Sequence, residues 1–291
     1  MKHKFLVPII TPFNADESVN YDSLARLTKA VLLSGADGIY AGGSSAECFL
    51  LDEDERKKTL ETVVKAADGA YVVAHVGAIS AHNSVELARH AKAAGANAIA
   101  SVPPFYFAYP FEGVLEYYRR LAEVALPVIV YSLPSATRKL TIDEYKALMT
   151  IDGVVGLKYT DTDYFTMQQI IAASGAEVYS GKDECFLSAL SMGAHGAIGS
   201  TFNFMLEAYP EIYRLYKAKK TDEALTVQSA ANAVTAVCIK NLLPAMKYLA
   251  TLRYGIDCGI ARCPFTPLTP ALTSELKTSF ETYLASAEYI K

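Results

Sequence analysis

Apolar and polar positions along the chain follow two alternating patterns. Short apolar runs rich in β-branched residues are separated by longer stretches in which apolar residues recur every three or four positions. Runs of the first kind are typical of strands buried on both faces, and the longer stretches are typical of helices that cover a sheet. Eight apolar runs occur: FLVPII (5–10), DGIYAGG (37–43), YVVAHVG (71–77), NAIASVP (97–103), PVIVYSL (127–133), GVVGLKYT (153–160), EVYSG (177–181) and GAIGS (196–200).

Eight consecutive β-then-α units predict an α/β fold, a closed (β/α)8 or TIM barrel, with a doubly wound open sheet as the alternative. No GxGxxG or GxxxxGK[ST] loop follows the first strand, so the nucleotide-binding form of an open sheet lacks its signature. From about Thr221 onward three helical stretches follow without strands. We therefore predict a barrel over residues 1–220 and a three-helix C-terminal extension, residues 221–291, packed on it.

Composition narrows the classes of partner. Of the 291 residues 52% are hydrophobic and 20% charged, as in ordinary globular proteins, and the net charge is −4 without a dense basic run. Nucleic acid and anionic membranes are therefore not expected as partners. Pro8 and Pro12 interrupt the apolar start, and no stretch approaches the roughly 20 apolar residues of a membrane span. We expect a cytoplasmic protein.

Cysteine and histidine spacing argues against metal sites and disulfides. The five cysteines are odd in number and form no CxxC pair, and the five histidines show neither HxH nor HExxH spacing. We therefore expect no metal and no disulfide framework.

A lysine and a tyrosine end two consecutive apolar runs. Lys158 ends the sixth predicted strand and Tyr131 the fifth, and in such barrels chemistry sits at the carboxyl ends of the strands. A lone lysine is usually a solvated surface cation. Inside a barrel rim, however, desolvation favours the neutral amine, which attacks carbonyl groups to give a Schiff base. A neighbouring phenol could transfer protons.

The loop after the second predicted strand offers donors to an anion. Gly42 and Gly43 permit close backbone approach, and Ser44 and Ser45 add hydroxyls. Glycine and serine clusters are usually only turns. Together with the amine and the phenol, however, a carboxylate clamp would indicate chemistry on a 2-oxo acid.

Several motifs in a fixed order carry a family resemblance. They are PIITPF (8–13), GGSSAE (42–47), PPFYF (103–107), YSLP (131–134), GLKYT (156–160), YSGKDE (179–184), GAIGSTFN (196–203), GID (255–257), Arg262 and Pro264. Over essentially its whole length the chain resembles the family of dihydrodipicolinate synthases and N-acetylneuraminate lyases. The resemblance implies a Schiff-base aldolase that needs no organic cofactor.

The resemblance also implies roles for the motif residues. Lys158 would be the Schiff-base lysine and Tyr131 the proton-transfer residue, while Ser44 and Ser45 would match the hydroxyl pair that binds the pyruvate carboxylate. Tyr106 matches a tyrosine that a neighbouring subunit contributes to a relay with Ser44 and Tyr131, so at least a dimer is needed, and the family's usual homotetramer, a dimer of dimers, is expected. The resemblance places further substrate contacts at Thr160, Gly181, Asp183, Glu184, Gly199 and Ser200.

Other positions bear on the branch of the family. The synthase branch has an arginine two positions after the proline of the YSLP motif, where this chain has Ala136, and Arg138 lies outside that pattern. This favours the lyase branch. A solvated acidic helix start would also explain Asp183 and Glu184.

Two residues depart from the family pattern. Ala46 replaces the usual glycine, so we expect a strained loop if that position requires a positive φ. Lys182 stands where some lyases have an aromatic residue, which could alter the preferred sugar.

The expected activity is reversible cleavage of N-acetylneuraminate to N-acetylmannosamine and pyruvate. The same chemistry would serve condensation of pyruvate with another aldehyde, as in 4-hydroxy-tetrahydrodipicolinate synthase or keto-deoxy sugar acid aldolases. A carbohydrate-binding relative without turnover is the alternative from a different class, although simple binding needs neither Lys158 nor Tyr131.

Overall fold

Eight parallel strands close into a barrel in the computed structural model, which describes residues 4–286. Each strand pairs with the next in chain order and β8 pairs with β1, which confirms the predicted closed barrel and excludes the open sheet. The strands are β1 (Phe5–Pro8), β2 (Gly38–Ala41), β3 (Tyr71–His75), β4 (Ala98–Ser101), β5 (Val128–Ser132), β6 (Val154–Tyr159), β7 (Glu177–Ser180) and β8 (Gly196–Ile198).

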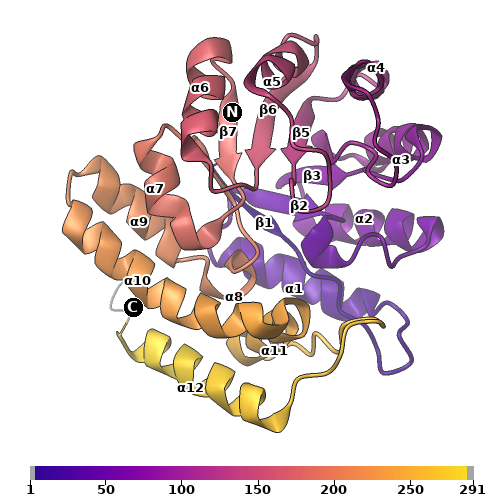
Figure 1. Ribbon diagram of the computed structural model, residues 1–291. Coiled ribbons are helices and arrows are strands. Elements are labelled where there is room, and N and C mark those ends of the chain that lie inside the picture. The colour runs from indigo at the N-terminus through magenta and orange to yellow at the C-terminus, as the bar shows by residue number, and fades with distance from the viewer. Residues whose placement is uncertain (1–3, 287–291) are drawn as a thin grey trace.

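Helices between the strands form the outer layer (Figure 1). Local sequence determines where several of them begin. Asp52 and Thr141 each accept a hydrogen bond from the backbone N–H three residues later and form capping boxes at α2 and α5. The helices are α1 (Tyr21–Leu33), α2 (Glu53–Ala67), α3 (Ala81–Ala94), α4 (Phe111–Ala122), α5 (Ile142–Met149), α6 (Tyr164–Ser174), α7 (Phe186–Ser191), α8 (Phe202–Met205) and α9 (Ala208–Lys217).

The alternation of side chains along each strand determines which residues fill the barrel. In β5, Val128 and Val130 pack in the larger core cluster shared with the helices, while Ile129 and Tyr131 belong to a separate, smaller cluster. That smaller cluster contains residues from seven strands, together with Val102 just after β4: Leu6, Tyr40, Val73, Ala98, Ala100, Val102, Ile129, Tyr131, Tyr179 and Ile198. It is the barrel interior. Lys158 pairs in register with Tyr131 on one side and Tyr179 on the other, so its side chain faces the same interior.

Three further helices lie together along one side of the barrel, with α10 beside α9 (Figure 1). They are α10 (Thr221–Cys238), α11 (Leu242–Tyr254) and α12 (Pro270–Ser286). The predicted three-helix extension is therefore confirmed, whereas a domain division after residue 220 stays a prediction. Residues 1–3 of the predicted barrel and residues 287–291 of the predicted extension lie outside the described residues.

Two sequence expectations concern the cysteines and membrane-spanning helices. All five cysteines are free, and Cys48, Cys238 and Cys258 are buried as small core residues. Between residues 4 and 286 no helix is long and apolar enough to cross a membrane.

Candidate active site

Lys158 and Tyr131 lie side by side inside the barrel. They are register partners on β6 and β5, and their side chains are only 5% and 3% exposed. The Lys158 Nζ lies 4.2 Å from the centroid of the Tyr131 ring and 4.5 Å from that of Tyr40, a cation–π arrangement when the amine is charged. Among residues 4–286 this Nζ has no hydrogen bond or ion pair. The surface-cation interpretation of Lys158 is therefore wrong, and the predicted neighbourhood of the two side chains is confirmed.

Tyr40 is a neighbour of this pair that the sequence did not single out. Its ring centroid lies 6.3 Å from that of Tyr131, and its buried hydroxyl has no hydrogen-bond partner in the described chain. Burial raises the pKa of Tyr40 well above its ordinary value, so this phenol stays neutral. Its inward position could have been found from the alternation along β2, had each strand been divided into its two faces.

His75 also joins the site without having been predicted. Its ring lies 5.9 Å from the Tyr131 ring, and burial lowers its pKa to about 3, so the imidazole is neutral. The Val102 N–H donates to Nε2 at 3.4 Å, which leaves the proton on Nδ1. Nδ1 therefore donates to the Gly42 carbonyl at 2.9 Å.

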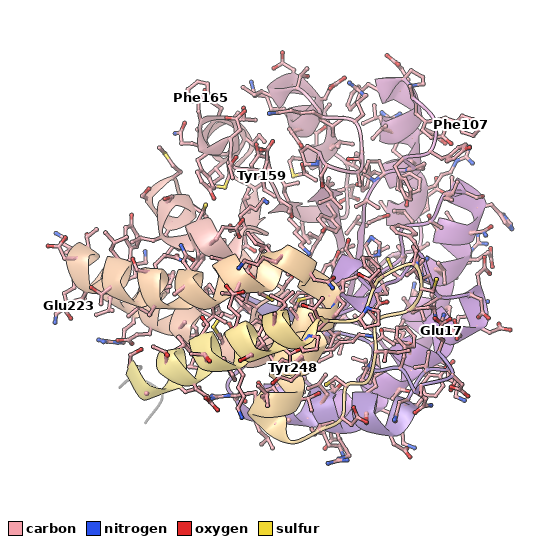
Figure 2. All side chains as sticks on the ribbon, turned by 60° about the horizontal axis from the view of Figure 1, so that its bottom comes forward. Glu17, Phe107, Tyr159, Phe165, Glu223 and Tyr248 are labelled. Carbon is pink, nitrogen blue, oxygen red and sulfur yellow. The ribbon has the colours of Figure 1, made fainter. Side chains whose placement is uncertain are left out.

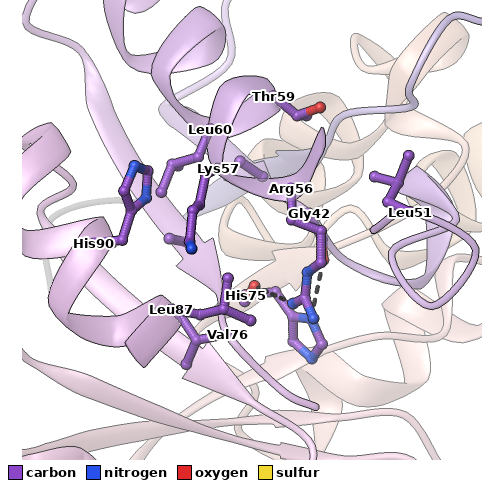
Figure 3. A pocket seen from close by; sticks show the side chains of 12 residues that line it. Gly42, Leu51, Arg56, Lys57, Thr59, Leu60, His75, Val76, Leu87 and His90 are labelled. Atoms are coloured by element: carbon purple, nitrogen blue, oxygen red, sulfur yellow. Dashed lines mark hydrogen bonds between the residues drawn. The ribbon is translucent and has the colours of Figure 1, made fainter. Parts of the chain in front are cut away.

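Arg56, on α2, makes hydrogen bonds to the backbone around His75. Its guanidinium donates to the carbonyls of Gly77 and His75 at 2.9 and 3.1 Å. Figure 3 shows Arg56 and His75 beside Gly42, with dashed lines for the hydrogen bonds. His75 thus holds the backbone that leads into the serine loop, and Arg56 holds the backbone at the end of β3 that carries His75.

The predicted carboxylate clamp is a short 3₁₀ helix, η1 (Ser44–Ala46). The Ser45 Oγ lies 2.8 Å from the Ser200 Oγ, which joins the ends of β2 and β8, while Ser44 is exposed. The N–H groups of Ala46 and Glu47 bond to the carbonyls of Gly43 and Ser44. No such bond holds the N–H groups of Ser44 and Ser45 within residues 4–286, so both can face a bound anion.

The expected strain at Ala46 is wrong. Ala46 has no positive φ and is fully buried. The left-handed residue is the next one, Glu47, with a φ of 57°. An alanine therefore fits this loop because the turn that needs the unusual conformation falls one position later.

Asp183 lies at the start of a second 3₁₀ helix, η2 (Asp183–Cys185), between β7 and α7. Its Oδ2 accepts hydrogen bonds of 2.8 Å from both the N–H and the hydroxyl of Thr201. The Oδ1 is buried and has no hydrogen-bond partner in residues 4–286. Burial raises the pKa of this carboxyl to about 6. A solvated helix start does not describe Asp183, which is 5% exposed.

Two glycines make room for polar atoms near β6, β7 and β8. A Cβ on Gly199 would lie 2.0 Å from the Asp183 Oδ1, and a Cβ on Gly181 would lie 2.0 Å from the Thr160 Oγ1. The Thr160 hydroxyl is also buried and unpartnered within the described chain. The structure thus gathers the predicted sugar-binding residues Thr160, Gly181, Asp183, Gly199 and Ser200 at the carboxyl ends of β6–β8.

Glu184 differs from Asp183 in being accessible. Its side chain is 40% exposed, and one carboxylate oxygen lies 3.5 Å from the Lys182 Nζ. The interpretation as a solvated acidic residue therefore fits Glu184 as well as a substrate contact does.

The single chain leaves Tyr106 exposed and away from Tyr131 and Ser44. It is 71% exposed, its ring contacts Phe107 at 4.9 Å between centroids, and within residues 4–286 it makes no hydrogen bond with Ser44 or Tyr131. Phe107 points outward at the edge of the molecule (Figure 2). No group of three or more His, Cys, Asp or Glu in the described residues could hold a metal ion.

The barrel with a lysine inside its rim matches a known family model. The description of that model is the dihydrodipicolinate synthetase family, and it covers residues 1–283. The chain belongs to this family. The match spans every site residue described above, so these residues form the candidate active site of an enzyme in a carbon–carbon lyase family.

Individual relatives agree with this assignment. The chain is 37% identical to the N-acetylneuraminate lyase of Rhizobium meliloti over 284 residues, which are 96% of this chain and 95% of the relative. The sialic acid aldolase of Ruminococcus gnavus superposes with a TM-score of 0.95 at 27% identity and full coverage of both chains; it has also been solved as a catalytic lysine mutant. A dihydrodipicolinate synthase of Bacillus anthracis superposes with a TM-score of 0.91 at 25% identity, covering 96% of this chain and 98% of that one. The fold is therefore common to both branches.

Proposed function

We propose that this chain is a Schiff-base aldolase that reversibly cleaves N-acetylneuraminate to N-acetylmannosamine and pyruvate. The observation that carries the proposal is a buried lysine amine without a polar partner in residues 4–286, adjacent to a buried tyrosine at the carboxyl rim of the barrel. A structural lysine in such a place would be expected to have an acidic or carbonyl partner. A nucleophile is expected to be left free.

The covalent chemistry follows from these two groups. The Lys158 amine attacks the C2 ketone of the open-chain sugar acid, and the Tyr131 phenol donates its proton to the departing water, which gives a protonated imine and a phenolate. Tyr131 accepts the proton of the C4 hydroxyl, the C3–C4 bond breaks, and its electron pair moves into the imine to form an enamine. N-acetylmannosamine departs as the aldehyde. Protonation of the enamine at C3 and hydrolysis of the imine release pyruvate and regenerate the amine.

The remaining site residues would bind different parts of the substrate. The free N–H groups of η1, with Ser45, support binding of the carboxylate next to C2. The unpartnered oxygens of Asp183 and Thr160 are acceptors suited to the hydroxyls of the sugar tail. Glu184 and Ser200 would add contacts at the same rim, and Gly181 and Gly199 leave the space.

The region after β5 supports the lyase branch of the family. Ala136 offers no cation to a second carboxylate, and Arg138 is bound instead to Glu144. An aldehyde without a carboxylate, such as N-acetylmannosamine, therefore suits this rim better than aspartate semialdehyde does. Another sugar-derived aldehyde is the second candidate, because Lys182 and Glu184 pair at the mouth in place of an aromatic residue.

Assembly and location are part of the proposal. A homotetramer would bury the exposed Tyr106 and Phe107 and could bring Tyr106 to a neighbouring site. Small-molecule substrates are the expected partners, and cytoplasmic location stays a prediction.

The proposal is tested by incubating purified enzyme with N-acetylneuraminate and measuring pyruvate release. Condensation of pyruvate is then measured with a panel containing N-acetylmannosamine, mannosamine, aspartate semialdehyde and glyceraldehyde. Release of pyruvate, with N-acetylmannosamine as the best acceptor, is expected. A different best acceptor would keep the aldolase and replace its substrate. Ligand-induced thermal stabilisation without any product would favour the binding-only alternative.

A further inference from the structure

The C-terminal extension reaches the barrel mouth at two separate loops. One contact is made to Glu47, directly after η1, which carries Ser44 and Ser45. The other is made to η2, which carries Asp183 and Glu184. Both involve side chains that are nearly inaccessible to solvent. Neither contact takes part in the chemistry described above.

The contact to η1 is an ion pair that is almost completely buried. The Lys247 Nζ, on α11, lies 2.7 Å from the Glu47 Oε1, and the two side chains are 1% and 0% exposed. The same Nζ donates to the Ile260 carbonyl and lies 4.0 Å from the centroid of the Phe13 ring. Burial lowers the pKa of Lys247 to about 8, while Glu47 raises it.

The second oxygen of Glu47 is held by the segment that follows α11. The Arg262 N–H donates to the Glu47 Oε2 at 2.8 Å. The Arg262 guanidinium in turn binds Glu55 with two hydrogen bonds of 2.7 and 2.8 Å and donates to the carbonyl of Glu17. Figure 2 shows the connection between α11 and α12 passing beside Glu17, and the Cys263 N–H donates to the Glu17 carboxylate.

Glu47 therefore has fixed partners on both carboxylate oxygens, two positions after Ser45. Its left-handed φ makes the backbone turn at that point. A carboxylate clamped from two distant segments and joined to such a turn restricts the orientation of the preceding N–H groups. Those N–H groups are the ones free to bind an anion.

The contact to η2 comes from α10 and uses neutral groups. The Gln228 Nε2 donates to the Asp183 carbonyl at 3.0 Å, and its Oε1 accepts from the Leu187 N–H at 3.1 Å. The Asn232 Nδ2 donates to the Glu184 carbonyl at 2.9 Å. The backbone that presents both acidic side chains is thus held from the extension.

We infer that the C-terminal extension positions the two halves of the substrate site separately. The Glu47–Lys247 pair sets the η1 loop for the carboxylate of the 2-oxo acid, and Gln228 sets the η2 loop for the hydroxyls of the aldehyde partner. These are positioning residues, and they touch no substrate. The inference rests on the proposed function, because it assigns a 2-oxo acid to one loop and a sugar aldehyde to the other.

The condensation direction separates the two roles, because pyruvate and N-acetylmannosamine then have independent KM values. Glu47→Gln is expected to raise the KM for pyruvate about tenfold, since the buried ion pair with Lys247 is lost, and to leave the KM for N-acetylmannosamine within twofold. Gln228→Met is expected to raise the KM for N-acetylmannosamine about tenfold and to leave the KM for pyruvate within twofold. Each variant is the control for the other. Arg253→Met, which breaks the pair between Arg253 of the extension and Glu207 of the barrel, should leave both KM values unchanged.

A merely structural role would lower the amount of folded enzyme and leave KM alone. The folded fraction is therefore measured as the fraction of Lys158 trapped by borohydride at saturating pyruvate. Removal of one charge leaves the other buried without its counter-ion. The double variant Glu47→Gln/Lys247→Met carries no buried charge and is the second form for the test, with the same raised KM for pyruvate expected.

Three results would overturn the inference. In the first, the KM for pyruvate of folded Glu47→Gln and of the double variant lies within twofold of the value for Arg253→Met. Another is an equal change of both KM values in both loop variants. The third is failure of all Glu47 and Lys247 variants to fold, which would make the pair part of the fold alone. Failure of the proposed function is distinct, because the unmodified enzyme would then show no condensation at all.

Discussion

Lys158 and Tyr131 pair in register across β6 and β5, and the lysine Nζ lies 4.2 Å from the centre of the tyrosine ring. A substrate carbon that forms an imine with Nζ therefore lies beside the phenol. Nucleophile and proton carrier are held by adjacent strands of one sheet, which is more rigid than a pair of loops.

Replacement of Tyr131 by phenylalanine should separate imine formation from carbon–carbon cleavage. We expect kcat for cleavage to fall by about 10²–10⁴-fold, because a positioned proton carrier is lost, while pyruvate still forms an imine. Steady-state pyruvate release and borohydride trapping are compared for the two enzymes. The account fails at this residue if kcat for Tyr131→Phe stays within twofold of the unmodified value.

Asp183 should make binding of the sugar acid depend on pH. Burial raises the pKa of its carboxyl to about 6, opposed by the hydrogen bonds from Thr201. The carboxyl is therefore protonated below pH 6 and loses acceptor capacity there. We expect the KM for N-acetylneuraminate to rise by up to about tenfold per unit as pH falls below 6, with a constant KM for pyruvate.

The control for this prediction is Asp183→Asn, which cannot ionise. Its KM for N-acetylneuraminate is expected to be higher than that of the unmodified enzyme at pH 7 and to vary little between pH 5 and pH 7. An unchanged pH profile in this variant would remove Asp183 from sugar binding.

Gly199→Ala should displace Asp183. The added Cβ would lie 2.0 Å from the Asp183 Oδ1 and 2.6 Å from the Phe202 ring, an overlap that costs about 1–3 kcal/mol of unfolding free energy. Denaturant unfolding and the KM for N-acetylneuraminate measure the effect. Gly113→Ala in α4 is the matched control, because its Cβ would have no neighbour within 4 Å. Equal stability of the two variants would contradict the described packing.

Lys182 should have a small effect on sugar binding. It pairs with Glu184 at 3.5 Å, and both side chains are more than a third exposed, a setting in which ion pairs contribute about 0–1 kcal/mol. Lys182→Met is therefore expected to change the KM for N-acetylneuraminate less than about fivefold, and less at high salt. A much larger change would make Lys182 a direct substrate contact.

The barrel could be predicted from the sequence because its strands are continuous apolar runs and its helices have a regular period. The position of Lys158 followed as well, since the carboxyl ends of barrel strands share one rim. Tyr40 and His75 were not found because a tyrosine or histidine within an apolar run is an ordinary core residue. Their importance comes from facing Lys158 inside the closed barrel.

The contacts of the extension could not be predicted from local pattern. Glu47 and Lys247 are separated by 200 positions, and nothing near either residue in the sequence indicates its partner. The Ala46 expectation was wrong for a related reason: which residue of a turn takes the left-handed conformation depends on the hydrogen bonds of that turn. Tyr106 shows the limit of a single chain, because its predicted role requires a neighbouring subunit.

The central claim is that Lys158 forms a covalent imine and that the enzyme then breaks the C3–C4 bond. The most direct test is borohydride reduction in the presence of N-acetylneuraminate, followed by intact mass and peptide mapping, with Lys158→Ala as the control. The account predicts a reduced pyruvyl adduct on Lys158 and none in the variant. Absence of an adduct with both N-acetylneuraminate and pyruvate, or an adduct on a different lysine, would contradict it.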